Sequence, residues 1–280
     1  MNNGASRRRW RLLGSFVLIL AALELLACVV AYLAQEELVF EPQPLTAARV
    51  REIAATHPAL HVVTLTNDAG LKLQGWSEAT RPGDDWLLYF HGVGEEASFS
   101  VRSLAEHTGW HVLGYNARGL GQSEGRPSEA ALFADALNIY DALQRDHHPH
   151  RLVIMGHSLG TGVATYLAQH RRADGVILIS PYDSVASVGK TRFPFLPVDC
   201  LLRDRFDMLP HAAAVHLPLL AVVGTRDGIV PPQHSLRLLA AWGGPHTLLT
   251  LPGAGHTTIM QPPTWQAIGE FLAARASARD

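Results

Sequence analysis

A serine, an aspartate and a histidine in this chain have the residue types and the order that acyl-transfer chemistry needs. Ser158 is the centre of the pentapeptide Gly156-His157-Ser158-Leu159-Gly160, and Asp227 and His256 follow it along the chain. A serine hydroxyl is a weak nucleophile at neutral pH, so it needs a neighbouring base, and that base needs an acid to orient it. We therefore predict Ser158 as the nucleophile, His256 as the general base and Asp227 as the acid of a catalytic triad.

The residues on either side of Ser158 predict a strand, a sharp turn and a helix. The apolar run Leu152–Met155 precedes the pentapeptide, and the small residues of Thr161–Ala168 follow it. Such a turn exposes the serine hydroxyl at the corner, close to helix N–H groups that can receive an anion. The flanking glycines are expected because side chains there would collide with the neighbouring helix or strand.

Asp227 and His256 each follow an apolar run that predicts a strand. Loops at the carboxyl ends of parallel strands are where an open α/β sheet places its ligands. Asp227 comes after Leu219–Val223 and His256 after Thr247–Leu251. Asp183 follows the preceding predicted strand and is the alternative acid.

The oxyanion formed during acyl transfer needs two aimed hydrogen-bond donors. We expect one to be the Leu159 backbone N–H, from the geometry of the turn. The other should come from the loop after Trp86–Phe90, where the Val93 N–H is our assignment and the Gly94 N–H the alternative. His91 in this loop is expected to brace it by hydrogen bonds.

Predicted strands and helices alternate after residue 60, which favours a mostly parallel sheet with helices on both faces. The predicted strands are His61–Leu65, Leu71–Trp76, Trp86–Phe90, His111–Tyr115, Leu152–Met155, Val176–Ile179, Leu219–Val223 and Thr247–Leu251. The predicted helices are Glu96–His107, Glu129–Asp146, Leu159–His170, Gln233–Trp242 and Pro263–Ala276. In the second helix the charged residues, Asp135 among them, are expected away from the apolar face.

The N-terminal segment is apolar enough to cross a membrane. Leu12–Ala34 spans 23 residues, and four arginines precede it. As a helix it covers roughly the 30 Å of a bilayer core, and the arginines would keep its start cytoplasmic. We favour an uncleaved signal-anchor over residues 1–34 with the rest exported; a cleaved signal and a lipoprotein attached at Cys28 are the alternatives. Residues 35–60 are expected to form a linker, Glu36–Pro44, and a short helix near Thr46–Thr56.

The composition fits one large exported domain, residues 61–280. Hydrophobic residues make up 48% of the 280, charged residues 17%, and the net charge of −2 gives no sign of nucleic-acid binding. No disulfide between Cys28 and Cys200 is expected. His147, His148 and His150 predict a solvated turn rather than a metal site, and the proposed chemistry requires neither metal nor cofactor.

Five motifs agree in order and spacing with one known superfamily. They are Tyr89–Gly92, Gly114–Gly125, Gly156–Gly160, Gly224–Asp227 and Gly255-His256. Over residues 60 to 275 the chain resembles the α/β-hydrolase superfamily, and within it the membrane-anchored serine hydrolases, whose segment after the anchor is echoed by Leu38–Pro42. The resemblance implies an α/β-hydrolase fold with a mostly parallel eight-stranded sheet and a short lid insertion at about residues 184–216. It also implies the triad roles of Ser158, Asp227 and His256.

One loop departs from the superfamily's pattern. Its D-Y-R-G sequence is replaced by Asn116-Ala117-Arg118-Gly119, which has lost the acidic residue. We expect the loop to be part of the scaffold, with a different partner for Arg118.

The expected activity is a serine hydrolase that cleaves an acyl ester, thioester or amide through an acyl-enzyme. An acyltransferase using the same serine and a non-catalytic membrane-tethered scaffold are the alternatives. The expected partners are a small acyl substrate, a lipid or an acylated protein, and the membrane. In the lid, Phe193–Pro197 is apolar and could line an acyl pocket, contact the bilayer or pack onto the domain.

Overall fold

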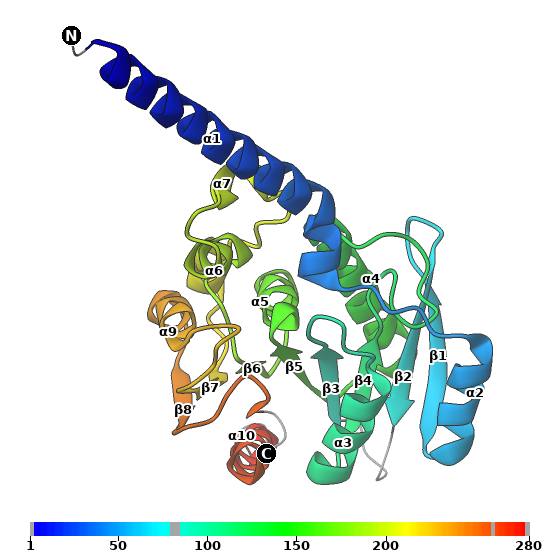
Figure 1. The fold of residues 1–280 in the computed structure, drawn as a ribbon. Helices are drawn as coiled ribbons and strands as arrows, with labels where there is room; N and C mark the ends of the chain where they lie inside the picture. Colours follow the sequence, from blue (N-terminus) through cyan, green and yellow to red (C-terminus); the bar gives the residue numbers. More distant parts are fainter. Residues whose placement is uncertain (1–2, 79–84, 259–260, 278–280) are drawn as a thin grey trace.

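A single twisted sheet organises the domain in the computed structural model, which describes residues 3–78, 85–258 and 261–277 (Figure 1). The strand order is β1-β2-β4-β3-β5-β6-β7-β8; β2 is antiparallel to both of its neighbours and all later pairings are parallel. The strands are β1 (Leu60–Thr66), β2 (Lys72–Glu78), β3 (Asp85–Phe90), β4 (His111–Tyr115), β5 (Arg151–His157), β6 (Gly175–Ile179), β7 (Leu219–Gly224) and β8 (His246–Leu251). The predicted eight-stranded, mostly parallel sheet is confirmed.

Helices cover both faces of this sheet. They are α1 (Asn3–Phe40), α2 (Ala47–Thr56), α3 (Ser98–Thr108), α4 (Glu129–His147), α5 (Leu159–His170), α6 (Val185–Arg192), α7 (Val198–Leu201), α8 (Leu209–Ala214), α9 (Pro232–Ala241) and α10 (Pro262–Ser277). In β3, Leu88 and Phe90 pack into one apolar core with residues of α4 and α5, whereas Leu87 and Tyr89 pack into a second core with residues of α3 and α10. Because successive side chains of a strand point to opposite faces, one short apolar run supplies both cores.

Helix α4 shows how the local sequence sets the ends of an element. Ser128 precedes the helix, and its hydroxyl accepts a hydrogen bond from the Ala131 N–H at 3.2 Å. The helix ends at His148, which has a left-handed conformation with φ 47°. Both signals are local, which explains why the predicted helix Glu129–Asp146 is nearly the observed one.

Helix α1 is longer than predicted, and the expected linker Glu36–Pro44 is helical as far as Phe40. Tertiary contacts favour this extension. The Gln35 side chain donates to the Leu201 carbonyl at 3.4 Å and accepts from the Arg203 N–H at 2.8 Å. Phe40 is buried, with its ring 6.2 Å from that of Phe206. The prediction of a linker here is therefore wrong for its first half.

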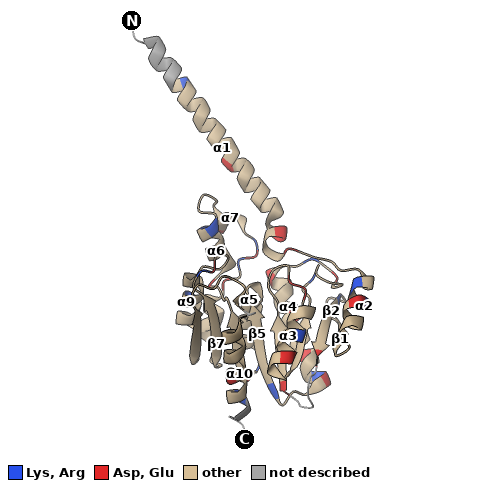
Figure 2. Cartoon of the chain, turned by 60° about the horizontal axis from the view of Figure 1, so that its bottom comes forward, with Lys and Arg blue, Asp and Glu red and all other residues tan. Residues whose placement is uncertain are grey.

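The rest of α1 extends away from the domain (Figure 1). From Trp10 to Phe40 it is long and apolar enough to cross a membrane, and Figure 2 shows few charged residues along it. The predicted lid region contains the short helices α6, α7 and α8, and α7 contacts α1. The anchor candidate and the lid thus lie at the same end of the domain (Figure 1).

Candidate active site

Ser158 occupies a strained corner between β5 and α5. Its φ of 50° and ψ of −119° are unusual for a residue with a side chain. A Cβ at Gly160 would collide with the Phe90 carbonyl oxygen, and one at Gly156 with the Gly160 carbonyl. The predicted reason for the flanking glycines is therefore confirmed, because helix and strand approach too closely for side chains.

Three loops at the carboxyl ends of β5, β7 and β8 bring Ser158, Asp227 and His256 together. His256 Nε2 lies 2.9 Å from Ser158 Oγ, and His256 Nδ1 lies 2.8 Å from one carboxylate oxygen of Asp227. The other Asp227 oxygen accepts the N–H groups of Ile229 at 2.9 Å and Val230 at 2.8 Å. This arrangement suits proton transfer from a serine hydroxyl to an imidazole whose second nitrogen is held by a carboxylate.

The Asp227 carboxylate is suited to remain ionised. Burial raises its pKa, but the hydrogen bond and charge of His256, together with the N–H groups of Val230 and Ile229, outweigh this and leave the pKa below its ordinary value. An ionised carboxylate here favours the His256 tautomer with the proton on Nδ1, which leaves Nε2 free to accept from Ser158.

Asp183, the alternative acid, makes its hydrogen bonds to other partners. Its carboxylate contacts His234 Nδ1 at 2.8 Å and accepts from Arg237 Nε at 2.6 Å. Its pKa is also lowered: burial raises it, and the bonds to Arg237 and His234 outweigh that. Asp227 is therefore the carboxylate that meets His256.

The loop after β3 runs against the Ser158 turn, as the predicted oxyanion site requires. A Cβ added at Gly92 would lie 3.3 Å from Ser158 Cβ. Among the described residues, the N–H groups of Val93 and Leu159 donate to no acceptor. His91 braces this loop as predicted, since its Nδ1 lies 2.7 Å from the Gly92 carbonyl oxygen and its Nε2 accepts from the Ala117 N–H at 2.9 Å.

Sequence reasoning missed Glu95, whose carboxylate lies within the site. One of its oxygens accepts from the Gly92 N–H at 3.0 Å and lies 3.0 Å from His157 Nδ1. The helix expected from Glu96 begins instead at Ser98, because the Glu95 and Glu96 side chains bond within the loop. The available signal was a pair of acidic residues within three positions of the predicted oxyanion donor.

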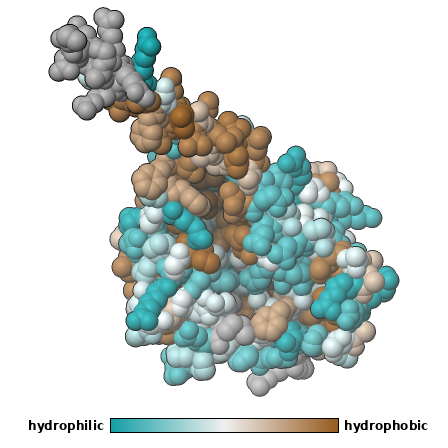
Figure 3. Space-filling view, in the orientation of Figure 1, coloured by the Kyte–Doolittle hydropathy of each residue, from teal (hydrophilic) through white to brown (hydrophobic). Residues whose placement is uncertain are grey.

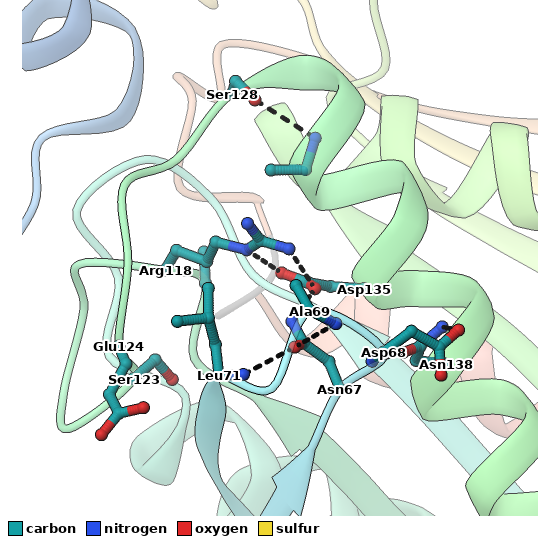
Figure 4. A network of polar contacts seen from close by, with 12 residues as sticks. Asn67, Asp68, Ala69, Leu71, Arg118, Ser123, Glu124, Ser128, Asp135 and Asn138 are labelled. Atoms are coloured by element: carbon teal, nitrogen blue, oxygen red, sulfur yellow. Dashed lines mark hydrogen bonds and ion pairs between the residues drawn. The ribbon is translucent and has the colours of Figure 1, made fainter.

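The acidic partner of Arg118 is Asp135 on α4 (Figure 4). Two of its nitrogens contact the two Asp135 oxygens at 2.7 and 2.8 Å, and Asn67 donates to Asp135 at 2.7 Å. The expectation that Asp135 lies away from the packed face is wrong, because only 6% of this residue is exposed. Its burial is compensated by the bidentate arginine.

An apolar cavity borders the predicted oxyanion site. Its wall includes Gly92 and Leu159 from the site, Leu132 and Ile139 from α4, and Phe40 from the end of α1. Figure 3 shows apolar surface continuing from α1 into a hollow of the domain. The lid residue Phe195 is 87% exposed, so it does not pack onto the domain.

The histidine tract and the two cysteines are the remaining residue types that could bind a metal. His147 lies in the last turn of α4, with its ring 4.5 Å from that of Trp86. Within the described ranges, no three His, Cys, Asp or Glu side chains gather as a metal site. Cys28 and Cys200 are both free thiols.

Comparisons with known proteins agree with this architecture. Residues 83–196 match the family described as serine aminopeptidase, S33. An uncharacterized protein of Mycobacterium tuberculosis is 35% identical over 228 residues, covering 79% of this chain and 80% of its own.

Two further similar proteins have names that state an activity. The lysophosphatidylserine lipase ABHD12 of Danio rerio is 29% identical over 196 residues, which cover 58% of this chain and 51% of that protein. The structure of the Pyrococcus furiosus esterase Pf2001 superposes with a TM-score of 0.64 at 20% identity, covering 78% of this chain and 91% of that one. At this identity the likeness concerns the fold.

Proposed function

Because this chain belongs to the α/β-hydrolase superfamily, we propose that it is a serine hydrolase that cleaves acyl esters, thioesters or amides. Family membership supports a hydrolase in general. The observation that carries the finer proposal is the continuous hydrogen-bonded path from Asp227 through His256 to Ser158. A path of this kind is what makes a serine hydroxyl nucleophilic at neutral pH.

In the proposed mechanism, Ser158 Oγ attacks the carbonyl carbon of the substrate while His256 Nε2 takes the hydroxyl proton. The negative charge on the former carbonyl oxygen is stabilised by the Leu159 and Val93 N–H groups. His256 then gives its proton to the leaving group, and the acyl group stays on Ser158. A water molecule activated by His256 releases the acid and restores the enzyme. Asp227 stabilises the imidazolium in both half-reactions.

The substrate class that fits best is an acyl compound with an apolar chain, either a lipid or an acylated protein. The apolar cavity beside Leu159 supports this, as does the name of the zebrafish relative, a lysophosphatidylserine lipase. The proximity of the end of α1 to the cavity further fits a substrate drawn from a membrane.

Labelling with a fluorophosphonate probe tests the nucleophile. We expect the full-length protein in detergent to be labelled and the Ser158→Ala variant to remain unlabelled. Wild type, but not Ser158→Ala, should also hydrolyse p-nitrophenyl esters. The rates for esters of increasing chain length would show which acyl length the enzyme prefers. An unlabelled wild type would contradict the proposal, and transfer of the acyl group to added alcohols in preference to water would favour an acyltransferase.

We further propose that α1 is an uncleaved signal-anchor and that the catalytic domain lies on the exported side. The length of the apolar helix and the arginines before it support this topology. Reporter fusions after Gln35 that are active only in the cytoplasm would contradict the orientation. Intact-mass measurement of the purified protein distinguishes the anchor from a cleaved signal or from a lipoprotein acylated at Cys28.

A further inference from the structure

The carboxylate of Glu95 is saturated with hydrogen bonds. One oxygen accepts from the hydroxyls of Tyr89 at 2.7 Å and Ser100 at 2.5 Å. The other accepts from the Gly92 N–H and from His157 Nδ1, both at 3.0 Å. A carboxylate offers about four acceptor positions, and all four are used here.

Two of these donors belong to the two halves of the predicted oxyanion site. Gly92 directly precedes Val93, whose N–H is one expected donor, and His157 directly precedes Ser158. A single oxygen of Glu95 therefore joins the loop after β3 to the last residue of β5, directly before the Ser158 turn. The Glu95 N–H also donates to the Gly92 carbonyl at 3.4 Å, so the turn is closed through the backbone as well.

The carboxylate must be ionised to accept four hydrogen bonds. Partial burial raises the pKa of Glu95, but the hydrogen bond and the charge of His157 more than compensate, so this pKa lies below its ordinary value. Hydrogen bonds to a charged acceptor are about twice as strong as those between neutral groups. A neutral amide at this position would turn one acceptor into a donor that faces other donors.

We propose that Glu95 is a positioning residue that holds the Val93 N–H against the Ser158 turn, so that both oxyanion donors point to the same place. The inference rests on the proposed serine hydrolase function. It has a specific kinetic consequence, because oxyanion donors act on charge that develops only in the transition state. Loosening the loop should therefore lower kcat and leave KM almost unchanged.

The test compares full-length wild type with Glu95→Gln in detergent, using a short-chain p-nitrophenyl ester. Complete loss of one oxyanion donor costs about 10²- to 10³-fold in kcat. For a displaced donor we expect a loss on the order of 10- to 100-fold, with KM within about twofold. Binding of an alkyl boronic acid, which forms a tetrahedral anion on the serine, should weaken by a similar factor.

Glu96→Gln is the matched control, because Glu96 is the adjacent acid and also makes side-chain hydrogen bonds. Its partners are Trp76, Ser98 and Asn116, which are not parts of the predicted oxyanion site. We expect Glu96→Gln to lower the melting temperature while kcat and boronate affinity stay near those of wild type. A variant that is only less stable would therefore differ from Glu95→Gln, for which we expect a lower kcat and weaker boronate binding.

A second variant covers the case in which Glu95→Gln does not fold. Tyr89→Phe removes one hydrogen bond from the other oxygen of Glu95 and keeps the size of the side chain. We expect a smaller fall in kcat, again with KM unchanged. If the folded variants match an active wild type in kcat and boronate affinity, the positioning role is wrong. A wild type that is itself inactive and unlabelled by fluorophosphonate would instead contradict the proposed function.

Discussion

Asp183 follows β6, and Asp227 follows the neighbouring strand β7. Their carboxylates form hydrogen bonds with different histidines. Asp227 meets His256, the predicted base, whereas Asp183 meets His234 at the start of α9. Both carboxylates have lowered pKa values, because hydrogen bonds from their partners outweigh the effect of burial. At the residue scale, the two carboxylates differ in the histidine that donates to them, and Asp227 is the one that meets the predicted base.

Replacing Asp227 by Asn should remove most of the activity. The amide keeps the size of the side chain but no longer stabilises the His256 imidazolium or its productive tautomer. We expect kcat/KM to fall by about 10³- to 10⁴-fold. Asp183→Asn is the matched control, expected to lower the melting temperature while kcat stays within several-fold of wild type. The reverse ranking of the two variants would assign the acid to Asp183.

The lowered pKa values of Asp183 and Asp227 predict how the stability of the fold depends on pH. Their folded-state pKa values lie below the ordinary value of about 3.9, so the unfolded chain binds more protons in acid. Their contribution is fully present well above pH 4 and is lost as the pH falls through the lowered folded-state values. Melting temperatures measured from pH 7 to pH 3 should fall on the acid side, and less steeply in Asp183→Asn. Equal slopes in both proteins would contradict this.

At the scale of elements, a buried ion pair adds to the local turns in holding the loop between β4 and α4. Arg118 in the loop and Asp135 on α4 keep only 14% and 9% of their side chains exposed, and Asn67 supplies a further hydrogen bond. The pair therefore joins the end of β1 and the loop after β4 to a helix that lines the apolar cavity (Figure 4).

Breaking this pair should be costly because it leaves a charge with little access to water. We expect Arg118→Met to lower the free energy of unfolding by about 3 kcal/mol. The control is Arg145→Met, which removes the solvent-exposed pair between Arg145 and Asp146 and should leave stability nearly unchanged. Urea titrations in detergent measure both. Similar losses in the two variants would show that Arg118 does not act through its buried partner.

At the scale of the whole molecule, α1 and the lid meet where the chain leaves the predicted membrane span. The Arg203 guanidinium lies 5.1 Å from the centre of the Tyr32 ring, and Gln35 bonds to the backbone of the lid. Tyrosines are enriched at membrane surfaces, so these contacts would place the lid near the lipid headgroups. The exposed Phe195, and Phe193 at 44% exposure, would then lie close to the bilayer.

Phe195→Asp should therefore impair action on substrates held in a membrane. In proteoliposomes we expect hydrolysis of a bilayer lipid ester to fall several-fold, because a charge replaces an apolar contact with the interface. Hydrolysis of a short soluble ester should stay unchanged. The control is Phe99→Asp, also an exposed phenylalanine at 50% but on α3, a helix that packs against β2, β4 and α10. Equal effects of both variants would contradict a membrane contact at the lid.

Local patterns were sufficient to predict most elements and the triad candidates. The sequence predicted each strand of the described residues to within a few residues. The central strands β3, β5, β6 and β7 are buried almost throughout, and a strand covered on both faces needs a short continuous apolar segment. The two glycines of the pentapeptide around Ser158 indicated a corner too tight for side chains, which the structure shows. The loops holding Asp227 and His256 could be identified because each follows such a run.

Contacts between distant segments could only be resolved in three dimensions. The choice between Asp227 and Asp183 depends on which loop reaches His256, and strand order decides this. Asp135 was expected away from the apolar face, but it is buried against Arg118. No role was predicted for Glu95, because Gly92 and His157 reach its carboxylate only in the folded chain. Helix periodicity and turn signals act over a few neighbouring residues, whereas hydrogen bonds and burial depend on segments that only the folded sheet brings together.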